Sequence, residues 1–325
     1  MSDRFPMGIP FGWFFIAYAD ELKPKDIKSL FYFNRHMVLF RTEKEDLGLM
    51  DAYCLHMGAH LGQGGVVEGD TIRCPFHDWA FDTKGHCKDI PYSSKIPKNL
   101  QNAKKCQKTY PVVEKNGVIW AWYHPQDLSP TFEVDEHPEV SSKDWLPLEK
   151  YQWTFHSNPQ EIAENGVDFA HFEYVHGMSE IPEGAFWYDG IKRISTAEGV
   201  RKIPDRKGGY TEKVTKIKTI QNGAGQKYTK ITGLTDTMVM VLVTPITKEK
   251  LELRFAFTHK KAQEDSLEYK AARATISRLI GKEGVAGDIP IWDNKVYHKH
   301  PLLCDGDGPI MKFRKYFKQF YAESF

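Results

Sequence analysis

One pattern of metal-ligating residues limits the fold of this chain more than any other feature. Cys54-Leu-His56 is followed, after seventeen residues, by Cys74-Pro-Phe-His77. Two short loops that each supply a cysteine and a histidine must be brought together by the strands around them if they bind one metal centre. A zinc finger usually places both cysteines in one loop and both histidines in the other. The mixed composition of each loop therefore departs from the usual zinc arrangement.

A Rieske [2Fe–2S] cluster requires this mixed composition, because two thiolates bind one iron and two imidazoles bind the other. We expect such a cluster to be held by four residues: Cys54, His56, Cys74 and His77. Imidazole ligands raise the reduction potential of the cluster, and they can pass electrons onward from near the protein surface. A zinc site is the alternative, and it would be colourless and give no Rieske signal in electron paramagnetic resonance.

A second candidate site lies in residues 164–176. His171 and His176 are five positions apart, which places them about 140° apart on an ideal helix. They can share a metal only if the helix distorts or ends between them, and Gly177 is suited to such an end. Two histidines and a distant carboxylate form the facial triad of non-haem iron oxygenases. Asp168 precedes His171 by one turn, so we expect it to accept a hydrogen bond from that imidazole.

The order of these patterns along the chain predicts two domains. Residues 12–125 contain short apolar runs separated by turn residues, which is typical of a small all-β domain. Residues 126–144 are rich in Pro, Asp, Glu and Ser and indicate a linker. Beyond them, residues 158–175 have helical character and residues 209–259 alternate as strands. We therefore expect an α+β chain with an all-β domain at 1–130 and a sheet-and-helix domain at 131–325.

Composition excludes several classes of function. Lys and Arg total 44 against 43 Asp and Glu, so the chain lacks the excess of positive charge that is typical of nucleic-acid-binding proteins. The apolar run at residues 11–19 is shorter than the ~18 residues of a membrane span, and it resembles a buried strand rather than a signal peptide. We expect a cytoplasmic protein without a membrane anchor. The remaining cysteines are expected to be free structural thiols: Cys87, Cys106 and Cys304. The basic residues of the tail are expected to form a solvated helix face: Lys312, Arg314, Lys315 and Lys318.

With these motifs the chain resembles the Rieske non-haem iron oxygenases, in particular the bacterial 3-ketosteroid 9α-hydroxylase oxygenases and sterol-modifying relatives such as the cholesterol 7-desaturases. The family pattern Glu/Asp-x3-Asp-x2-His-x4-His is present from Glu164 to His176. The stretches Asp51-Ala-Tyr-Cys-Leu-His and Asp288-Ile-Pro-Ile-Trp are also shared. The resemblance implies a helix-grip catalytic domain, and it implies Asp288 as the third iron ligand, with Asp293 as the competing candidate.

The resemblance also implies an activity and partners. The expected cofactors are a [2Fe–2S] cluster and a mononuclear Fe(II), and the expected reaction is hydroxylation of a steroid with dioxygen. Electrons would come from a separate NAD(P)H-dependent, ferredoxin-type reductase. A head-to-tail homotrimer would bring His77 of one subunit to Asp168 of the next. The alternatives are a sterol desaturase or demethylase, an oxygenase of another hydrophobic compound, a lipid-binding protein on the same scaffold and a pure electron carrier.

Overall fold

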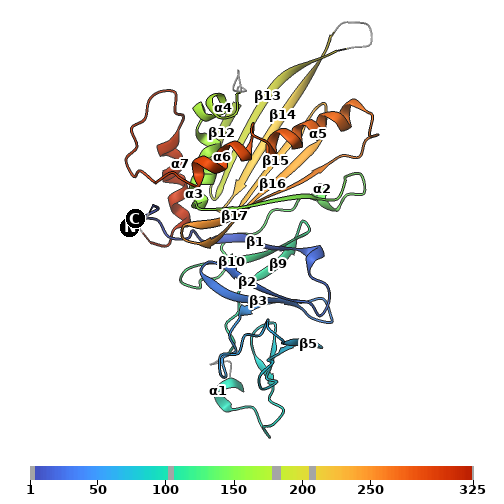
Figure 1. Cartoon of the computed structure of the whole chain (residues 1–325), viewed down its shortest axis with the longest axis vertical. Helices are drawn as coiled ribbons and strands as arrows, with labels where there is room; N and C mark the ends of the chain where they lie inside the picture. Colours follow the sequence, from blue (N-terminus) through green and yellow to red (C-terminus); the bar gives the residue numbers. More distant parts are fainter. Residues whose placement is uncertain (1–3, 102–105, 178–183, 205–209, 324–325) are drawn as a thin grey trace. The chain divides into compact units, whose positions relative to one another are not determined.

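The computed structural model describes residues 4–101, 106–177, 184–204 and 210–323 (Figure 1). The chain divides into two compact units. One comprises Trp13–Glu133, and the other comprises Val134 onward together with the residues before Trp13. Among the described residues, no helix is both long and apolar enough to span a membrane.

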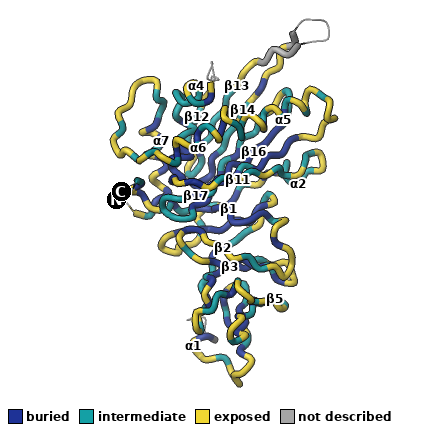
Figure 2. Tube along the Cα trace, viewed as in Figure 1, coloured by how far each residue is buried: buried dark blue, intermediate teal, exposed yellow. Residues whose placement is uncertain are grey.

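The first unit is built from three small antiparallel sheets, as the turn-rich sequence predicts. The first sheet has the order β1 (Gly12–Tyr18), β10 (Val118–Tyr123), β9 (Val112–Lys115), and the second has the order β2 (Ile27–Tyr32), β3 (Arg35–Arg41), β4 (Leu47–Asp51). The third contains β5 (Val66–Glu68), β6 (Thr71–Arg73), β7 (Ala80–Asp82) and β8 (Cys87–Asp89). Strand β1 is buried along its whole length, so its apolar residues form a core strand (Figure 2).

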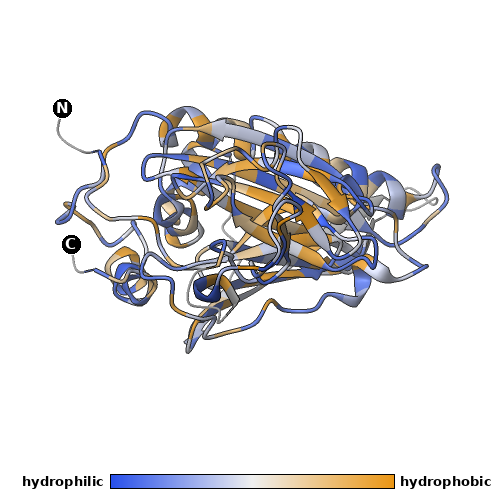
Figure 3. Ribbon diagram, turned by 90° about the horizontal axis from the view of Figure 1, so that it is seen from below, coloured by the Kyte–Doolittle hydropathy of each residue, from blue (hydrophilic) through white to orange (hydrophobic). Residues whose placement is uncertain are grey.

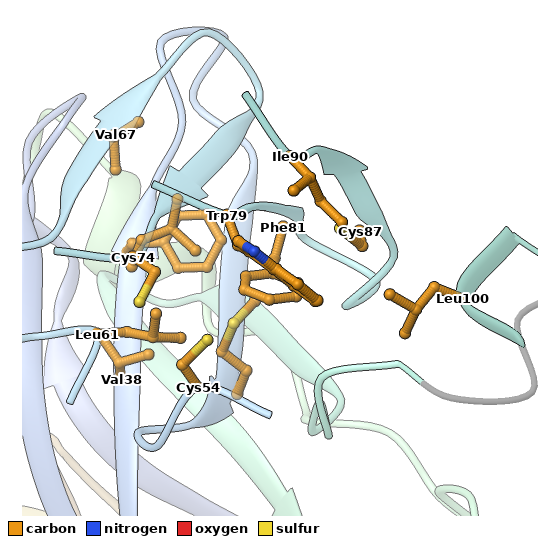
Figure 4. Packing of buried hydrophobic residues seen from close by; sticks show 13 residues of the cluster. Val38, Cys54, Leu61, Val67, Cys74, Trp79, Phe81, Cys87, Ile90 and Leu100 are labelled. Carbon is orange, nitrogen blue, oxygen red and sulfur yellow. The ribbon is translucent and has the colours of Figure 1, made fainter. Parts of the chain in front are cut away.

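A compact apolar core surrounds the two cysteine-containing loops. Cys54 and Cys74 are buried with aromatic and aliphatic side chains from the second and third sheets, among them Val38, Val67 and Phe81 (Figure 4). The first loop runs from β4 to β5 and the second from β6 to β7, so short paired strands hold both ends of each loop. A short helix, α1 (Lys98–Gln101), adds Leu100 to the same core.

The second unit is a seven-stranded antiparallel sheet with helices. Its strand order is β11-β17-β16-β15-β14-β13-β12. The strands are β11 (Glu149–Phe155), β12 (Gly184–Asp189), β13 (Lys192–Pro204), β14 (Tyr210–Asn222), β15 (Gln226–Thr232), β16 (Thr237–Thr247) and β17 (Lys250–His259). Hydrophobic residues gather in the strands, and the connecting loops are mostly hydrophilic (Figure 3). This is the α+β class expected from the sequence.

Helices cover one face of this sheet. Valines 239, 241 and 243 of β16 pack with Ile276 and Trp292, which come from α5 (Leu267–Ile280) and α6 (Val285–Trp292). The same core includes Ile162 of α3 (Pro159–Glu164). The remaining helices are α2 (Pro138–Ser141), α4 (Ala170–Tyr174) and α7 (Ile310–Phe317). The core therefore lies between β16–β17 and the helices, next to the segment that carries the histidine pair.

Residues 158–175 do not form one continuous helix. Asn158 caps α3, since its side chain accepts a 3.0 Å hydrogen bond from the backbone N–H of Gln160. The helix tightens into a 3₁₀ turn at Asn165–Val167, and the extended backbone of Asp168 separates it from α4. Helix α4 ends at Tyr174, and Gly177 takes a positive φ of 64°. The histidines five apart are therefore placed on a broken helix.

Candidate functional site

The two cysteine loops repeat the same backbone turn. The N–H of Gly58 donates to the carbonyl of Cys54 at 2.8 Å, and the N–H of Asp78 donates to the carbonyl of Cys74 at 3.0 Å. Both turns end on a residue of positive φ, 77° at Gly58 and 56° at Asp78. Each loop therefore presents its cysteine and histidine from one tight turn, although the histidines stand at different offsets from the cysteines.

The four side chains of this first site lie together. The two cysteines are buried, while the His56 and His77 rings are half-buried with their centroids 4.8 Å apart. His56 stacks on Trp79 at 4.3 Å with nearly parallel planes. The Nδ1 atoms of both histidines are buried and have no hydrogen-bond partner. Unpaired buried nitrogens are costly, so these two atoms are poised for a ligand.

The electrostatics of the cysteines also fit a cluster. Burial, together with the neighbouring Cys74, raises the pKa of the Cys54 thiol to about 12. Two buried thiols at hydrogen-bond distance become thiolates only when a cation compensates their charge. The donor set of two sulfurs and two imidazole nitrogens therefore suits a [2Fe–2S] group with mixed ligation.

The second site brings together His171, His176 and Asp288. One ligand atom from each residue lies within 4.8 Å of the others. The break at the end of α4 allows this, because the N–H of His176 bonds to the carbonyl of His171, five positions back, at 3.3 Å. The imidazole centroids are 4.9 Å apart and the rings are nearly perpendicular. Two histidines and one carboxylate with the remaining directions open form a facial-triad donor set.

Hydrogen bonds fix the tautomer of His171. Its Nδ1 donates to the main-chain carbonyl of Asp168 at 2.6 Å, which leaves Nε2 with its lone pair toward the site. The Asp168 carboxylate lies farther from this nitrogen, at 3.9 Å, and 40% of its side chain is exposed. Burial lowers the pKa of both His171 and His176, so the neutral ligand form is favoured. Asp168 thus orients the ring through its backbone, and its carboxylate remains accessible.

Asn165 was not anticipated from the sequence. Its side-chain Nδ2 lies 3.0 Å from His171 Nε2 and 3.2 Å from a carboxylate oxygen of Asp288. The amide therefore donates to the point on which these acceptor atoms converge. A cation satisfies the same acceptors, so the arrangement fits a metal ion. The only sequence signal was the position of Asn165 between Glu164 and Asp168.

Asp288 and Asp293 occupy different surroundings. Asp288 is buried on α6, with its Oδ1 3.4 Å from His176 Nε2. Burial raises the pKa of Asp288 to about 7, while Asn165 and Lys227 lower it. Asp293 instead accepts a 2.6 Å hydrogen bond from the backbone N–H of His156. The structure therefore groups Asp288, and not Asp293, with the two histidines.

One sequence-based expectation was wrong. Arg314 was expected on a solvated helix face, but it forms two 2.7 Å hydrogen bonds to the carboxylate of Glu164, and both side chains are largely buried. This fork joins α7 to the end of α3, next to Asn165. The energetic reason is that a buried carboxylate requires a partner, and the guanidinium matches its geometry.

Comparisons with known proteins identify the domain families of both parts of the chain. The Rieske [2Fe–2S] domain family matches residues 12–111, and the 3-ketosteroid 9α-hydroxylase C-terminal domain family matches residues 121–321. The oxygenase component of a 3-ketosteroid-9-alpha-monooxygenase from Rhodococcus rhodochrous is 31% identical over 96% of this chain and 84% of its own. A cholesterol 7-desaturase from Caenorhabditis elegans is 29% identical over 98% of this chain and 78% of its own.

Solved structures share the fold. Apo dicamba monooxygenase superposes with a TM-score of 0.71 at 17% identity, covering 97% of both chains. NdmA of Pseudomonas putida CBB5, crystallised with theobromine, gives a TM-score of 0.70 at 17% identity over 94% of this chain and 89% of its own. The fold and the two donor sets thus define an iron-dependent oxidoreductase with a Rieske cluster and a mononuclear iron. The chain belongs to the Rieske oxygenases whose catalytic domain is of the 3-ketosteroid 9α-hydroxylase type.

Proposed function

We propose that this chain is the oxygenase component of a monooxygenase that hydroxylates a steroid. The observation that carries this proposal is the match of residues 121–321 to the 3-ketosteroid 9α-hydroxylase catalytic domain, in a unit where His171, His176 and Asp288 converge. Dioxygen is the oxidant, and a separate reductase supplies two electrons. One oxygen atom enters the carbon–hydrogen bond of the substrate, and the other leaves as water with two protons.

The cluster is assigned to the first donor set, Cys54, His56, Cys74 and His77, and the mononuclear iron to the second. When bound, these groups supply electron transfer and dioxygen activation. The protein residues supply geometry. The carbonyl of Asp168 holds His171 in one tautomer, and α6 carries Asp288 to the same point.

The proposal includes an assembly and a location. Asp168 keeps a partly exposed carboxylate beside His171, and His77 is half-buried beside the exposed Phe76 and Tyr92. A homotrimer in which His77 of one subunit meets Asp168 of the next would join the two sites by a short hydrogen-bonded path. We place the protein in the reducing cytoplasm, since none of the five cysteines, all of which the structure describes, forms a disulfide. There an NAD(P)H-dependent, ferredoxin-type reductase would supply the electrons.

Turnover of a steroid panel with a surrogate reductase, followed by product mass spectrometry, tests the function. A product heavier than its substrate by one oxygen atom, labelled from ¹⁸O₂, is expected. His171→Ala and His176→Ala should abolish turnover and mononuclear iron while the visible spectrum of the cluster is retained. If no steroid in the panel gives an oxygen-dependent product, the substrate assignment is wrong.

Desaturation is the second candidate. Cholesterol 7-desaturases from Ciona intestinalis and Caenorhabditis elegans align with 100% and 98% of this chain. Both reactions begin at an unactivated carbon–hydrogen bond, so the same iron donor set serves either. Product mass separates them, because a desaturated product is lighter than its substrate by two hydrogens.

A further inference from the structure

The helix-covered face of the seven-stranded sheet is divided into a polar and an apolar half. Paired residues on adjacent antiparallel strands share a face, so the register gives a continuous row across the sheet. This row reads, from β12 to β11, Tyr188, Arg193, Gln221, Lys227, Val241, Phe255 and Tyr151. Val241 belongs to the core beneath α3, α5 and α6, which identifies this face as the helix-covered one. The two cations therefore point to the same side as that core.

The row two residues away repeats the division. Its β13–β15 members are Ser195, Thr219 and Thr229, and the hydroxyls of Thr219 and Thr229 are hydrogen-bonded at 3.0 Å. On β16 and β17 the same row continues with Val239 and Phe257. Polar groups are thus confined to β13–β15, while aliphatic and aromatic groups occupy β16 and β17.

A cavity lies where the two halves meet. It is lined by Ile162 and Ala163 of α3, by Gln221 and Lys227, and by Val241 and Val243. The free space is about that of one water molecule, so the cavity can receive only a small group at one end of a substrate. Lys227 is near the mononuclear site, because its charge acts on both His171 and Asp288.

Among the described residues, Asp288 is the carboxylate whose charge acts on Lys227. The Lys227 ammonium makes no hydrogen bond or ion pair in the described part of the chain. The oxygens of Asp288, the nearby carboxylate, face Asn165 and His176 instead. A half-buried ammonium without a hydrogen-bonded partner loses hydration, and the attraction of Asp288 offsets only part of that loss. Such a group in a cavity wall indicates an absent anionic partner.

Arg193 adds to the positive potential. It is only 4% exposed, and its single hydrogen bond among the described residues runs from Nη2 to the carbonyl of Gly166, at 2.8 Å. Its Nε and Nη1 atoms are buried without partners, as is the Oε1 atom of Gln221 between the two cations. Burial and the charge of Arg193 both lower the pKa of Lys227, to about 8.

We propose that Lys227 is a specificity-determining residue that binds a carboxylate at one end of the substrate. This inference rests on the proposed function and narrows it to steroids that bear an acidic group. The Lys227 ammonium donates a charge-assisted hydrogen bond to the carboxylate, and the amide of Gln221 lies beside it on the neighbouring strand. A neutral carbonyl would leave the ammonium uncompensated.

The test compares one 3-keto steroid that carries a side-chain carboxylate with the methyl ester of the same steroid. Binding to the protein with both cofactors loaded is measured by calorimetry without oxygen, and kcat/KM is then measured with a surrogate reductase. Native protein is expected to bind the acid more tightly than the ester. Lys227→Met should weaken acid binding by about 10- to 100-fold, the loss expected for one charge-assisted hydrogen bond, and leave ester binding unchanged.

Lys218→Met is the matched control, since Lys218 is exposed on the opposite face of the adjacent strand. Lys218→Met should change the affinity for neither the acid nor the ester. Iron content should be the same in the native protein, Lys227→Met and Lys218→Met. Equal loss of acid and ester binding in Lys227→Met, loss of iron in that variant, or tighter binding of the ester by native protein would each overturn the inference while the proposed function stands. If neither steroid binds or turns over, the proposed function fails and the inference fails with it.

Discussion

The buried fork between Glu164 and Arg314 allows a quantitative prediction about the scaffold of the iron site. Two hydrogen bonds of 2.7 Å join side chains that are 8% and 11% exposed. Glu164→Gln removes the charge and one acceptor oxygen, so the Arg314 guanidinium is left buried with two neutral acceptors, the amide oxygen at position 164 and the His298 carbonyl. Removing one partner of a buried ion pair lowers the free energy of unfolding by about 3–5 kcal/mol. Because the amide oxygen keeps one hydrogen bond, we expect a loss of about 3 kcal/mol for this variant.

Urea unfolding measured by fluorescence of the catalytic-unit tryptophans tests the value. The free energy of unfolding falls by about 2–3 kcal/mol per M of urea, so the urea concentration at the unfolding midpoint should fall by about 1–1.5 M. The visible absorbance of the cluster, which reports on the other unit, should be lost at an unchanged urea concentration. Glu283→Gln is the control, because the Arg278–Glu283 pair spans 3.4 Å and is exposed, and it should cost less than about 1 kcal/mol.

A double-mutant cycle isolates the pair. Arg314→Met together with Glu164→Gln should cost much less than the sum of the single changes, since no unpaired charge then remains. Two outcomes would contradict this: Glu164→Gln lowers the free energy of unfolding by no more than Glu283→Gln does, or the double variant loses the sum of the two single losses. In either case the Glu164–Arg314 pair does not stabilise this region, and the argument from burial is refuted.

Three further predictions concern the cofactor sites and the start of α3. Cys54→Ser should eliminate the visible and paramagnetic signals of the cluster, while metal analysis still finds one mononuclear iron per chain. Asn158→Ala should lower the free energy of unfolding by about 1–2 kcal/mol in urea, because its side chain accepts from the Gln160 N–H and the Tyr321 hydroxyl; no change would exclude a capping role. In the metal-free protein the pKa of Asp288 is raised from 3.8 to about 7, so the folded state keeps a proton that the unfolded chain loses between about pH 4 and 7. Stability should therefore fall as the pH rises through this window, by up to about 4 kcal/mol, and Asp288→Asn should remove the fall in urea titrations at pH 5 and 8.

The sequence predicted those features that depend on short separations. Cys54 and His56 share one tight turn, so their spacing alone predicts a ligand pair. The separation of His171 and His176 required a break in the helix, and the structure has α4 ending between them. The apolar run at residues 11–19 forms a buried strand, because it is too short to span a membrane and too apolar to lie on the protein surface.

Features that depend on partners far along the chain were not predictable. Asn165 serves an aspartate 123 positions away, and Arg314 pairs with a glutamate 150 positions away. No local pattern distinguishes Arg314 from the solvated lysines beside it. The acceptor for His171 is the main-chain carbonyl of Asp168, which follows from the extended backbone at that residue and not from its side chain. The positions of Lys227 and Arg193 on one face required the register of the whole sheet.

The two donor sets differ in how much chain must fold before each is complete. The first lies within residues 54–77, whereas the second joins α4 to α6 across six strands, β12 to β17, and helix α5. Closing the longer loop costs more entropy and must await the long-range strand pairs. The cluster site can therefore form while the second unit is still unfolded, but the mononuclear site cannot. Iron occupancy of that site thus reports that the catalytic sheet has finished folding, which makes the cluster the early step of maturation and the mononuclear iron the late one.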